Sequence, residues 1–324
     1  MKKILFATYP MAFHTVGGGE VQLRAYANAL GQKGINVEFL DMWNPNFKNY
    51  DLVHFFSCVG GSYNFCHFIK TLEIPLVVSS SLWITPGTEK SYPISDIINQ
   101  LNLADRIVTN SNLESDLLAK TMNIDYKKFS HVYNGYDKSI LRYCHQNLDK
   151  VKGMVLNVGN IELRKNQLNL ARALKNIPGA TLHLAGGVRD KEYFGEIMKE
   201  IPGRVVYHGV LQANSKELME LYRQCDVFIL PSLLETPGLA AIEAYVMGAK
   251  VVVTREGSAR EYFEDNVIYI NPEKIDSIER GIRDAFEDLG CKKIEREKFR
   301  ESFEWGVVTN RLVNIYDEVI NDIN

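Results

Sequence analysis

Short apolar runs alternate with longer segments of helical period along the whole chain, and this rhythm limits the folds that the chain can adopt. The runs lie at residues 4–7, 37–40, 52–56, 76–79, 106–109 and 131–133, and then at 154–158, 181–185, 205–207, 227–230 and 251–254. Buried strands that alternate with helices are typical of parallel sheets with helices on both faces. The sequence therefore predicts an α/β fold with doubly wound parallel sheets.

A polar segment at residues 137–152 has no clear period and separates two such series of runs. Because 324 residues are more than one α/β domain usually needs, we predict two Rossmann-like domains, 1–150 and 151–302. The chain closes with a helical segment, about 303–324, that is a candidate to pack back on the first domain. Its apolar stripe consists of Val308, Leu312, Ile315 and Val319.

The composition argues against several classes of protein. A formal net charge of −3 lacks the basic excess of nucleic-acid-binding proteins, so we expect no nucleic-acid partner. The five cysteines are scattered and form no CxxC motif, which disfavours a disulfide framework or a zinc site and indicates a reducing compartment. No apolar stretch approaches the ~20 residues of a membrane span, and the first run is too short for a signal peptide. We expect a cytoplasmic protein without a transmembrane segment, and leave open peripheral contact with the inner face of the membrane.

The most informative segment is 226–243, in which a buried strand leads into a helix start. Ligands of open α/β sheets bind beyond the carboxyl ends of the strands. We expect Thr236 at the N-cap and Pro237 at the first helical position. The next amides, at Gly238 and Leu239, would then point out of the helix end and form a site for a phosphate group.

Two glutamates flank this helix start. Glu235 lies in the loop before it, and Glu243 lies about one and a half turns into the helix. Both side chains can face one cleft, where carboxylates would accept hydrogen bonds from sugar and ribose hydroxyls. The competing interpretation is a solvated loop acid at 235 and a surface charge network at 243.

A glycine triplet follows the first run, and Gly18 and Gly19 stand at the start of the next helix. Glycine lets a backbone approach a ligand closely, and a helix start favours anions. A plain tight turn is the alternative, and Glu20 could be ordinary first-turn helix chemistry.

Together these motifs resemble a known family, and the resemblance spans almost the whole chain. Glu235 and Glu243 match its E-x7-E pattern, residues 157–167 match its strand, glycine turn and basic pair, and residues 17–20 match its glycine-rich loop. The family is the retaining glycosyltransferases of GT-B fold, glycosyltransferase family 4, also described as glycosyl transferases group 1. Two Rossmann-like domains face a central cleft in this fold.

The resemblance implies roles for single residues. Glu235 would contact the donor sugar and Glu243 the ribose of the nucleotide. The amides of Gly238 and Leu239 would bind the diphosphate, and Lys165 falls on the family's phosphate lysine. A fixed cation there stabilises the charge that a diphosphate leaving group gains in the transition state.

One departure concerns the residue after Gly159. Family members usually carry an arginine there, whereas this chain has Asn160. Either Arg164 shares the task of the missing cation or the diphosphate contact is weaker. The alternative for Arg164 and Lys165 is that both are surface charges beside a turn.

A second departure concerns the first domain. Residues 50–54 resemble the strand that carries a histidine towards the cleft, which makes His54 a catalytic candidate, although a structural histidine is the alternative. Many relatives place another histidine after the strand at 76–79, where this chain has Ser79, Ser80 and Ser81. Either a serine supplies the hydrogen bond, or His54 or His14 substitutes.

The resemblance implies transfer of a sugar, a hexose by expectation, from a nucleoside diphosphate sugar to an acceptor hydroxyl with retention at the anomeric carbon. The acceptor would be a saccharide or a lipid-linked saccharide, in polysaccharide or glycoconjugate synthesis. The donor is a substrate, and we expect no cofactor. No clustered Asp/Asp or His/Cys pattern offers a metal cage, so we expect a metal-independent site.

Other functions compete with this one. A sugar-nucleotide epimerase could use the same two-domain cleft, although the glutamate pair and Lys165 fit a transferase better. A nicotinamide dehydrogenase would need a G-x-G-x-x-G turn, which residues 17–19 do not supply. A catalytically degenerate nucleotide-binding protein is the third reading, prompted by Asn160 and the serine run.

Overall fold

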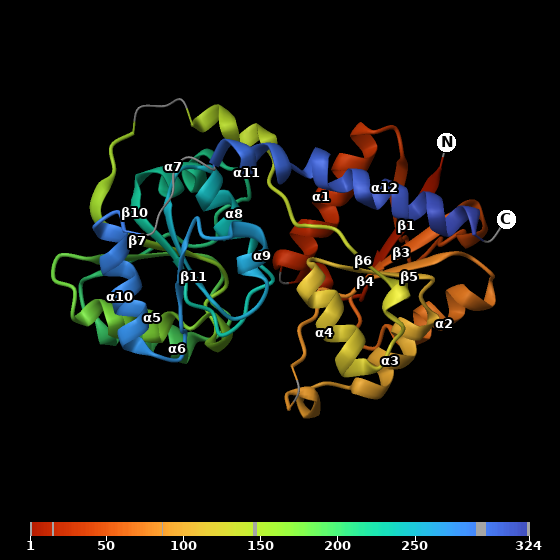
Figure 1. Ribbon diagram of the computed structural model, residues 1–324, viewed down its shortest axis with the longest axis horizontal. Helices are drawn as coiled ribbons and strands as arrows, with labels where there is room; N and C mark the ends of the chain where they lie inside the picture. The colour runs from red at the N-terminus through yellow and green to blue at the C-terminus, as the bar shows by residue number, and fades with distance from the viewer. Residues whose placement is uncertain (1, 15, 86, 145–147, 290–295, 323–324) are drawn as a thin grey trace. The chain divides into compact units, whose positions relative to one another are not determined.

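The computed structural model describes residues 2–14, 16–85, 87–144, 148–289 and 296–322 (Figure 1). The chain forms two compact units, one of Met1–Gly135 with Phe303–Asn324 and the other of Tyr136–Ser302. The division thus falls earlier than the boundary expected at 150, and the chain returns to the first unit after residue 302. The polar segment expected as a connection belongs to the second unit, where Lys138–Tyr143 forms a 3-10 helix.

The first unit is built on a six-stranded parallel sheet in the order β2-β1-β3-β4-β5-β6. Its strands are β1 (Lys3–Thr8), β2 (Asn36–Phe39), β3 (Leu52–Phe56), β4 (Leu76–Ser79), β5 (Arg106–Thr109) and β6 (Phe129–His131). Its helices are α1 (Gly18–Gln32), α2 (Tyr63–Thr71), α3 (Ile94–Leu103), α4 (Asn112–Met122) and α12 (Trp305–Asn321).

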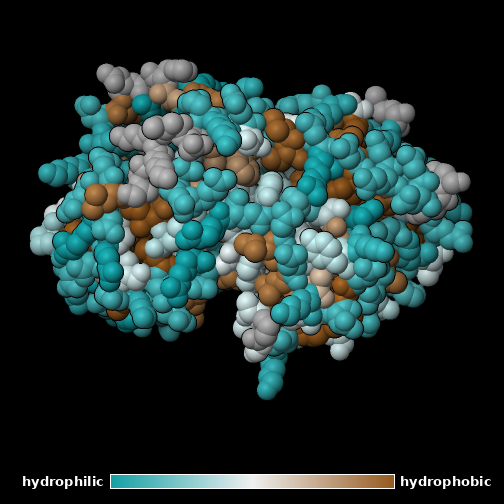
Figure 2. All heavy atoms as spheres, in the orientation of Figure 1, coloured by the Kyte–Doolittle hydropathy of each residue, from teal (hydrophilic) through white to brown (hydrophobic). Residues whose placement is uncertain are grey.

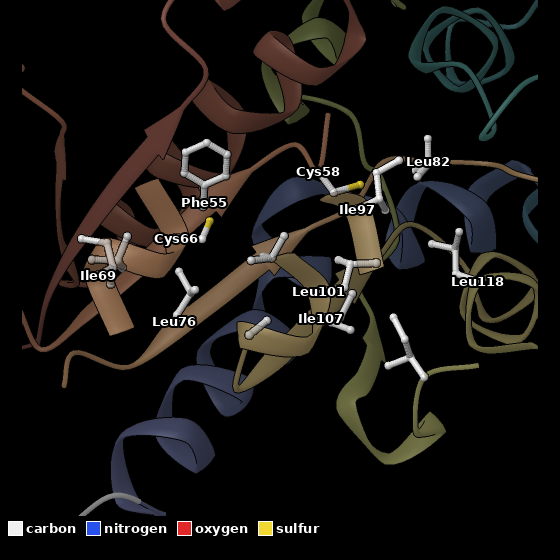
Figure 3. Close-up of a cluster of buried hydrophobic side chains, with 14 of the residues drawn as sticks. Phe55, Cys58, Cys66, Ile69, Leu76, Leu82, Ile97, Leu101, Ile107 and Leu118 are labelled. Atoms are coloured by element: carbon white, nitrogen blue, oxygen red, sulfur yellow. The ribbon is translucent and has the colours of Figure 1, made fainter. Parts of the chain in front are cut away.

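One face of this sheet packs against α2, α3 and α4. Alternate strand residues such as Phe55 and Leu76 meet Ile69 of α2, Leu101 of α3 and Leu118 of α4 in one buried cluster (Figure 3). Side chains of period two along strands and about 3.6 along helices meet at such an interface. This cluster is the core on that face of the first unit.

The opposite face is covered by α1 and α12, which lie side by side (Figure 1). The stripe of α12 formed by Val308, Leu312, Ile315 and Val319 is buried. Tyr26 of α1 and Trp305 of α12 meet edge to face, with ring centroids 5.6 Å apart. This apolar stripe is what ties the last helix to the first unit.

The second unit also carries a six-stranded parallel sheet, in the order β12-β11-β10-β7-β8-β9. Its strands are β7 (Val151–Val158), β8 (Thr181–Ala185), β9 (Val205–Tyr207), β10 (Cys225–Leu230), β11 (Lys250–Thr254) and β12 (Ile268–Ile270). Its helices are α5 (Gln167–Lys175), α6 (Lys191–Glu200), α7 (Lys216–Gln224), α8 (Leu239–Val246), α9 (Ala259–Phe263), α10 (Ile275–Phe286) and α11 (Arg296–Ser302). Helices α5, α6 and α10 contribute to one buried cluster with the sheet.

The predicted fold class is confirmed, because both units are parallel α/β sheets wound in both directions. Strands expected at 52–56, 76–79, 106–109, 181–185 and 205–207 are found at those residues. The strand expected at 131–133 is shifted to Phe129–His131, and the sequence analysis did not predict β12.

Hydrophilic residues cover most of the face drawn in Figure 2, with smaller apolar areas between them. Within the described ranges, no helix has both the length and the apolar composition that a membrane crossing requires. Four of the five cysteines (Cys58, Cys66, Cys144 and Cys225) are free thiols, and the fifth, Cys291, lies outside the described residues.

Candidate active site

Lys165 and Glu235 form a buried ion pair where the strand order of the second sheet reverses. Lys165 follows β7 and Glu235 follows the neighbouring strand β10, and open α/β sheets bind ligands at this switch point. Lys165 Nζ donates to Glu235 Oε1 at 2.5 Å, and the Ser232 hydroxyl donates to the same oxygen at 2.6 Å. The structure thus brings two predicted residues into contact.

The charge state of Glu235 follows from these contacts. Glu235 is 5% exposed, and burial alone would raise its pKa. The charges of Lys165 and Arg164 and the hydrogen bonds from Lys165 and Ser232 outweigh burial and lower the pKa. Glu235 is therefore ionised and holds the Lys165 ammonium in a fixed position.

The residue next to Lys165 anchors this loop. Asn166 has a left-handed backbone conformation, with φ of 61°, which asparagine tolerates better than most residues. Its buried side-chain amide donates to Pro231 O at 2.9 Å and to Pro272 O at 2.7 Å. These bonds tie the loop after β7 to the loops after β10 and β12.

Glu235 is positioned by a backbone pairing with the loop after β11. Its N–H donates to Glu256 O at 3.2 Å, and its carbonyl accepts from the Ser258 N–H at 3.1 Å. Gly257, between these two residues, has φ of +108°, and a Cβ there would lie 1.9 Å from Glu235 O. Only glycine fits, so this glycine sets the place of the carboxylate.

The start of α8 differs from the sequence prediction. Gly238 is the N-cap, with φ of +88°, and the helix begins at Leu239. The expectation of Thr236 at the N-cap and Pro237 at the first helical position is therefore wrong. Thr236 and Pro237 lie in the preceding loop, and glycine at the cap tolerates the positive φ. The first amides of the helix, beginning at Leu239, still lie next to Glu235, because a Cβ at Gly238 would be 3.0 Å from Glu235 Oε2.

Glu243 lies in the same helix and is held by a buried tyrosine. The hydroxyl of Tyr222, on α7, donates to Glu243 Oε2 at 3.0 Å. Burial raises the pKa of Glu243 to about 7, the tyrosine hydrogen bond opposes this rise, and the charge of Asp137 adds to it. Glu243 is thus a carboxyl group that titrates near neutral pH.

Arg164 and Asn160 lie in the loop that carries Lys165. Arg164 donates to Leu234 O at 3.3 Å and to Glu162 Oε1 at 3.0 Å, and 53% of its side chain is exposed. The side-chain amide of Asn160 is oriented so that its oxygen faces donors and its nitrogen faces acceptors. In this orientation Asn160 Oδ1 accepts from Arg189 Nη2 at 3.0 Å and from Arg189 Nε at 3.1 Å. Asn160 therefore contacts a cation that the sequence analysis did not select.

Gly18 and Gly19 form the first turn of α1 in the first unit. Gly17 is the N-cap, and its N–H donates to Glu20 Oε2 at 2.7 Å. A Cβ at Gly18 or Gly19 would have no atom within 4 Å. Among the described residues no contact requires these glycines, and Glu20 has the first-turn capping role considered above.

His54 makes the contacts of a structural residue. It is completely buried on β3, beneath α12. Its Nδ1 lies 2.6 Å from the Tyr316 hydroxyl and its Nε2 lies 2.8 Å from the Ser79 hydroxyl. Burial lowers its pKa to about 3, so the ring is neutral. His54 therefore has no exposed atom with which to act as a catalytic group. The alternative of a structural histidine has the stronger support.

The serine run after β4 is divided between buried and exposed positions. Ser79 bonds His54, and the Ser80 hydroxyl donates to the buried Glu114 at 2.7 Å. Ser81 is exposed, with φ of 43°, and its hydroxyl donates to Gln22 at 3.3 Å. Of the three serines, Ser81 alone is exposed.

The sequence of the second unit matches a known protein family. Residues 145–303 match the family model "Glycosyl transferases group 1". A curated relative, an uncharacterized glycosyltransferase of Methanocaldococcus jannaschii, is 30% identical over 174 residues, which are 50% of this chain and 44% of that protein. The sulfoquinovosyl transferase SQD2 of Arabidopsis thaliana is 24% identical over 65% of this chain and 41% of its own length. The chain thus spans less than half the length of these two glycosyltransferases.

Solved structures show the GT-B fold for the whole chain. The sucrose-phosphate synthase of Thermosynechococcus elongatus has a TM-score of 0.78 at 18% identity, over 99% of this chain and 100% of that one. HepE of Anabaena, solved with UDP and glucose, has a TM-score of 0.76 at 18% identity, over 98% of this chain and 100% of its own. At such identities the likeness establishes the fold of this chain and not its substrates.

Three residues around the site were missed by sequence reasoning. Ser232 stands three positions before Glu235, in a turn whose polar residue was a usable signal. Arg189 follows a glycine pair after the strand at 181–185, which is also a signal. Tyr222 had none, because its contact with Glu243 depends on how α7 packs on α8.

Proposed function

We propose that this chain is a glycosyltransferase that moves a sugar from a nucleoside diphosphate sugar to a hydroxyl group of an acceptor. The observation that carries the proposal is the Lys165–Glu235 pair at the switch point of the second sheet, next to the start of α8. A cation, a helix start and a carboxylate at one place suit a ligand that carries both phosphates and sugar hydroxyls. The family of residues 145–303 supports the same activity.

The second unit would hold the donor in three parts. The diphosphate would accept hydrogen bonds from Lys165 and from the amides at Gly238 and Leu239, while Glu243 would accept from a ribose hydroxyl. An ammonium group has three N–H donors, so Lys165 can bind a phosphate oxygen while it stays bound to Glu235. Glu235 has a second oxygen, directed towards Gly238, with which to accept from a hydroxyl of the donor sugar.

We propose that the reaction proceeds with retention at the anomeric carbon and without a metal ion or cofactor. The bond from the anomeric carbon to the diphosphate oxygen breaks, and a bond to the acceptor oxygen forms on the same face. The proton of the acceptor hydroxyl moves to the departing diphosphate. Lys165 and the start of α8 stabilise the negative charge that develops on the leaving group.

The proposed donor carries a uracil base in the first instance, since HepE has been solved with UDP-glucose as well as with UDP. The proposed acceptor is a saccharide, and the proposed role is in polysaccharide or glycoconjugate synthesis.

Calorimetric titration of the full chain with UDP, GDP, ADP and their glucose and mannose conjugates tests the donor site. We expect one nucleotide to bind selectively and Glu243→Gln to bind it about tenfold more weakly, the loss typical of one hydrogen bond to a charged group. Glu192→Gln, an exposed glutamate in the first turn of α6, is the matched control. A chain that binds none of these nucleotides at millimolar concentration is not a glycosyltransferase of this kind. Selective binding without turnover on any acceptor would favour the degenerate nucleotide-binding protein.

A further inference from the structure

Arg189 lies in the loop after β8, beside the loop that carries Asn160 and Lys165. Backbone hydrogen bonds join the two loops: the Ile161 N–H donates to Gly187 O at 2.8 Å, and the Arg189 N–H donates to Ile161 O at 3.2 Å. Since β7 and β8 are neighbouring parallel strands, both loops stand at the same edge of the sheet. Arg189 therefore belongs to the edge at which the ion pair lies.

A glycine makes the approach of these loops close. Gly186 has φ of +147°, and a Cβ there would lie 2.0 Å from Gly159 O. Gly159 in turn packs against Lys165, whose Cε would be 3.6 Å from a Cβ at residue 159. Arg189 thus follows, by three residues, Gly186, whose backbone contacts the loop that carries Lys165.

The guanidinium of Arg189 is held from two sides. Its Nη2 and Nε donate to Asn160 Oδ1 at 3.0 and 3.1 Å, and its Nη1 donates to Glu162 Oε2 at 3.2 Å. The side chain remains 40% exposed. Asn160, which cannot carry charge itself, therefore holds a positive charge that comes from the next loop.

Lys165 and Arg164 are two further cations of this edge. Lys165 is paired with the ionised and buried Glu235. Arg164 is directed to Leu234 O and to Glu162, and it is more exposed than Arg189. Arg189 is thus the arginine that Asn160 fixes beside the glycine turn after β7.

We propose that Arg189, oriented by Asn160, binds the diphosphate of the donor together with Lys165. The inference rests on the proposed function and adds a residue to it. A planar guanidinium presents paired N–H donors that match two phosphate oxygens, and it stays charged at every physiological pH. Its immobilisation by Asn160 and Glu162 lowers the entropy lost when the phosphate binds. Asn160 is then a positioning residue, and Arg189 contacts the substrate.

Binding of inorganic pyrophosphate and of the preferred nucleoside diphosphate to variants of the full chain tests this role. Arg189→Gln should weaken both ligands about tenfold or more, as expected for one lost charge-assisted hydrogen bond. Arg172→Gln is the matched control, because Arg172 is similarly exposed on α5 and pairs with Glu200. Arg189→Lys, which keeps the charge, should lose less affinity than Arg189→Gln, and equal losses in the two variants would overturn the proposal.

A rescue experiment separates anion binding from a merely structural contact between the loops. In the double variant Asn160→Arg with Arg189→Gln, the cation returns at residue 160, and pyrophosphate affinity should recover most of the tenfold loss. If affinity stays low and the thermal midpoint also falls below that of the wild type, the loss follows from the broken contact and Arg189 is only a link between loops. A wild-type chain that binds no nucleoside diphosphate refutes the proposed function, whereas wild-type affinity in Arg189→Gln refutes only the role of Arg189.

Discussion

At the scale of single residues, the ion pair of Lys165 and Glu235 combines a structural requirement with the catalytic role that we propose for it. Both side chains are largely buried, so removal of one leaves the other as an uncompensated charge. Such a loss costs about 3–5 kcal/mol of stability, whereas replacement of both partners by neutral groups costs far less. The pair therefore allows stability and catalysis to be separated by mutation.

Lys165→Met should lower both stability and turnover. We expect about 3 kcal/mol of destabilisation in urea unfolding and a loss of about 10²–10³ in kcat, as for removal of one donor to a developing oxyanion. The double variant Lys165→Met with Glu235→Gln should regain most of the stability but not the turnover. A double variant with wild-type turnover would remove Lys165 from the mechanism.

Glu243 should make donor binding depend on pH near neutrality. Its pKa of about 7 means that the ionised form, the better acceptor for a ribose hydroxyl, grows as pH rises. Affinity for the nucleotide sugar should increase from about pH 6 to about pH 8 and then level off. In Glu243→Gln this dependence should disappear. Tyr222→Phe should move its midpoint upwards, because the tyrosine hydrogen bond lowers the pKa.

Through Glu243, a rise in pH should affect the stability of the chain in the opposite direction to its effect on donor affinity. A carboxyl group whose pKa is raised on folding binds more protons in the folded chain than in the unfolded one. The contribution of Glu243 to stability therefore falls as pH rises from about 4.5 towards about 7, and it is unfavourable above that range. Glu243→Gln should accordingly raise the thermal midpoint at about pH 8 more than at about pH 5.

At the scale of elements, the loop after β11 determines where Glu235 lies. Gly257→Ala should destabilise the chain by more than about 1 kcal/mol, the usual cost of a side chain at positive φ, because its Cβ would also collide with Glu235 O. It should weaken nucleotide-sugar binding as well. Gly203→Ala is the control, since Gly203 has φ of +72° but a Cβ there meets no atom within 4 Å. Equal thermal midpoints for the two variants would contradict this account.

The attachment of α12 depends on a polar contact inside an apolar interface. Tyr316→Phe should destabilise the chain by about 1–3 kcal/mol, because Nδ1 of the buried His54 loses its partner. Nucleotide binding should be unchanged, since both residues belong to the first unit. Urea unfolding with Tyr126→Phe, at a tyrosine that is 51% exposed, provides the comparison. A loss of turnover without loss of stability would return His54 to the catalytic residues.

At the scale of the whole molecule, each unit has its own sheet and its own buried core. The proposed donor contacts all come from the second unit. In the proposal, Lys165, Arg189 and the start of α8 stabilise the negative charge of the donor's diphosphate. Because these groups are part of the chain, turnover should be unchanged by millimolar EDTA. Restoration of lost turnover by Mg²⁺ or Mn²⁺ after chelation would show that a divalent cation shares this role.

The sequence by itself determined the class of fold, and it selected Lys165 and Glu235, which the structure brings into contact. Strand and helix periods are local, and the rhythm of apolar runs therefore located most strands of both sheets. The spacing of Glu235 and Glu243 and the position of Lys165 after a strand were likewise readable, since strand ends gather at one edge of a parallel sheet.

Only the tertiary structure decided which polar residues meet. The helix start at Gly238 instead of Thr236 reflects a loop held by pairing with residue 257, far along the chain. Burial under α12 separates His54 from solvent, although its strand was correctly predicted. The contacts of Tyr222 with Glu243 and of Arg189 with Asn160 join side chains 21 and 29 residues apart. Such contacts depend on how helices and loops pack, and a local pattern carries no information about them.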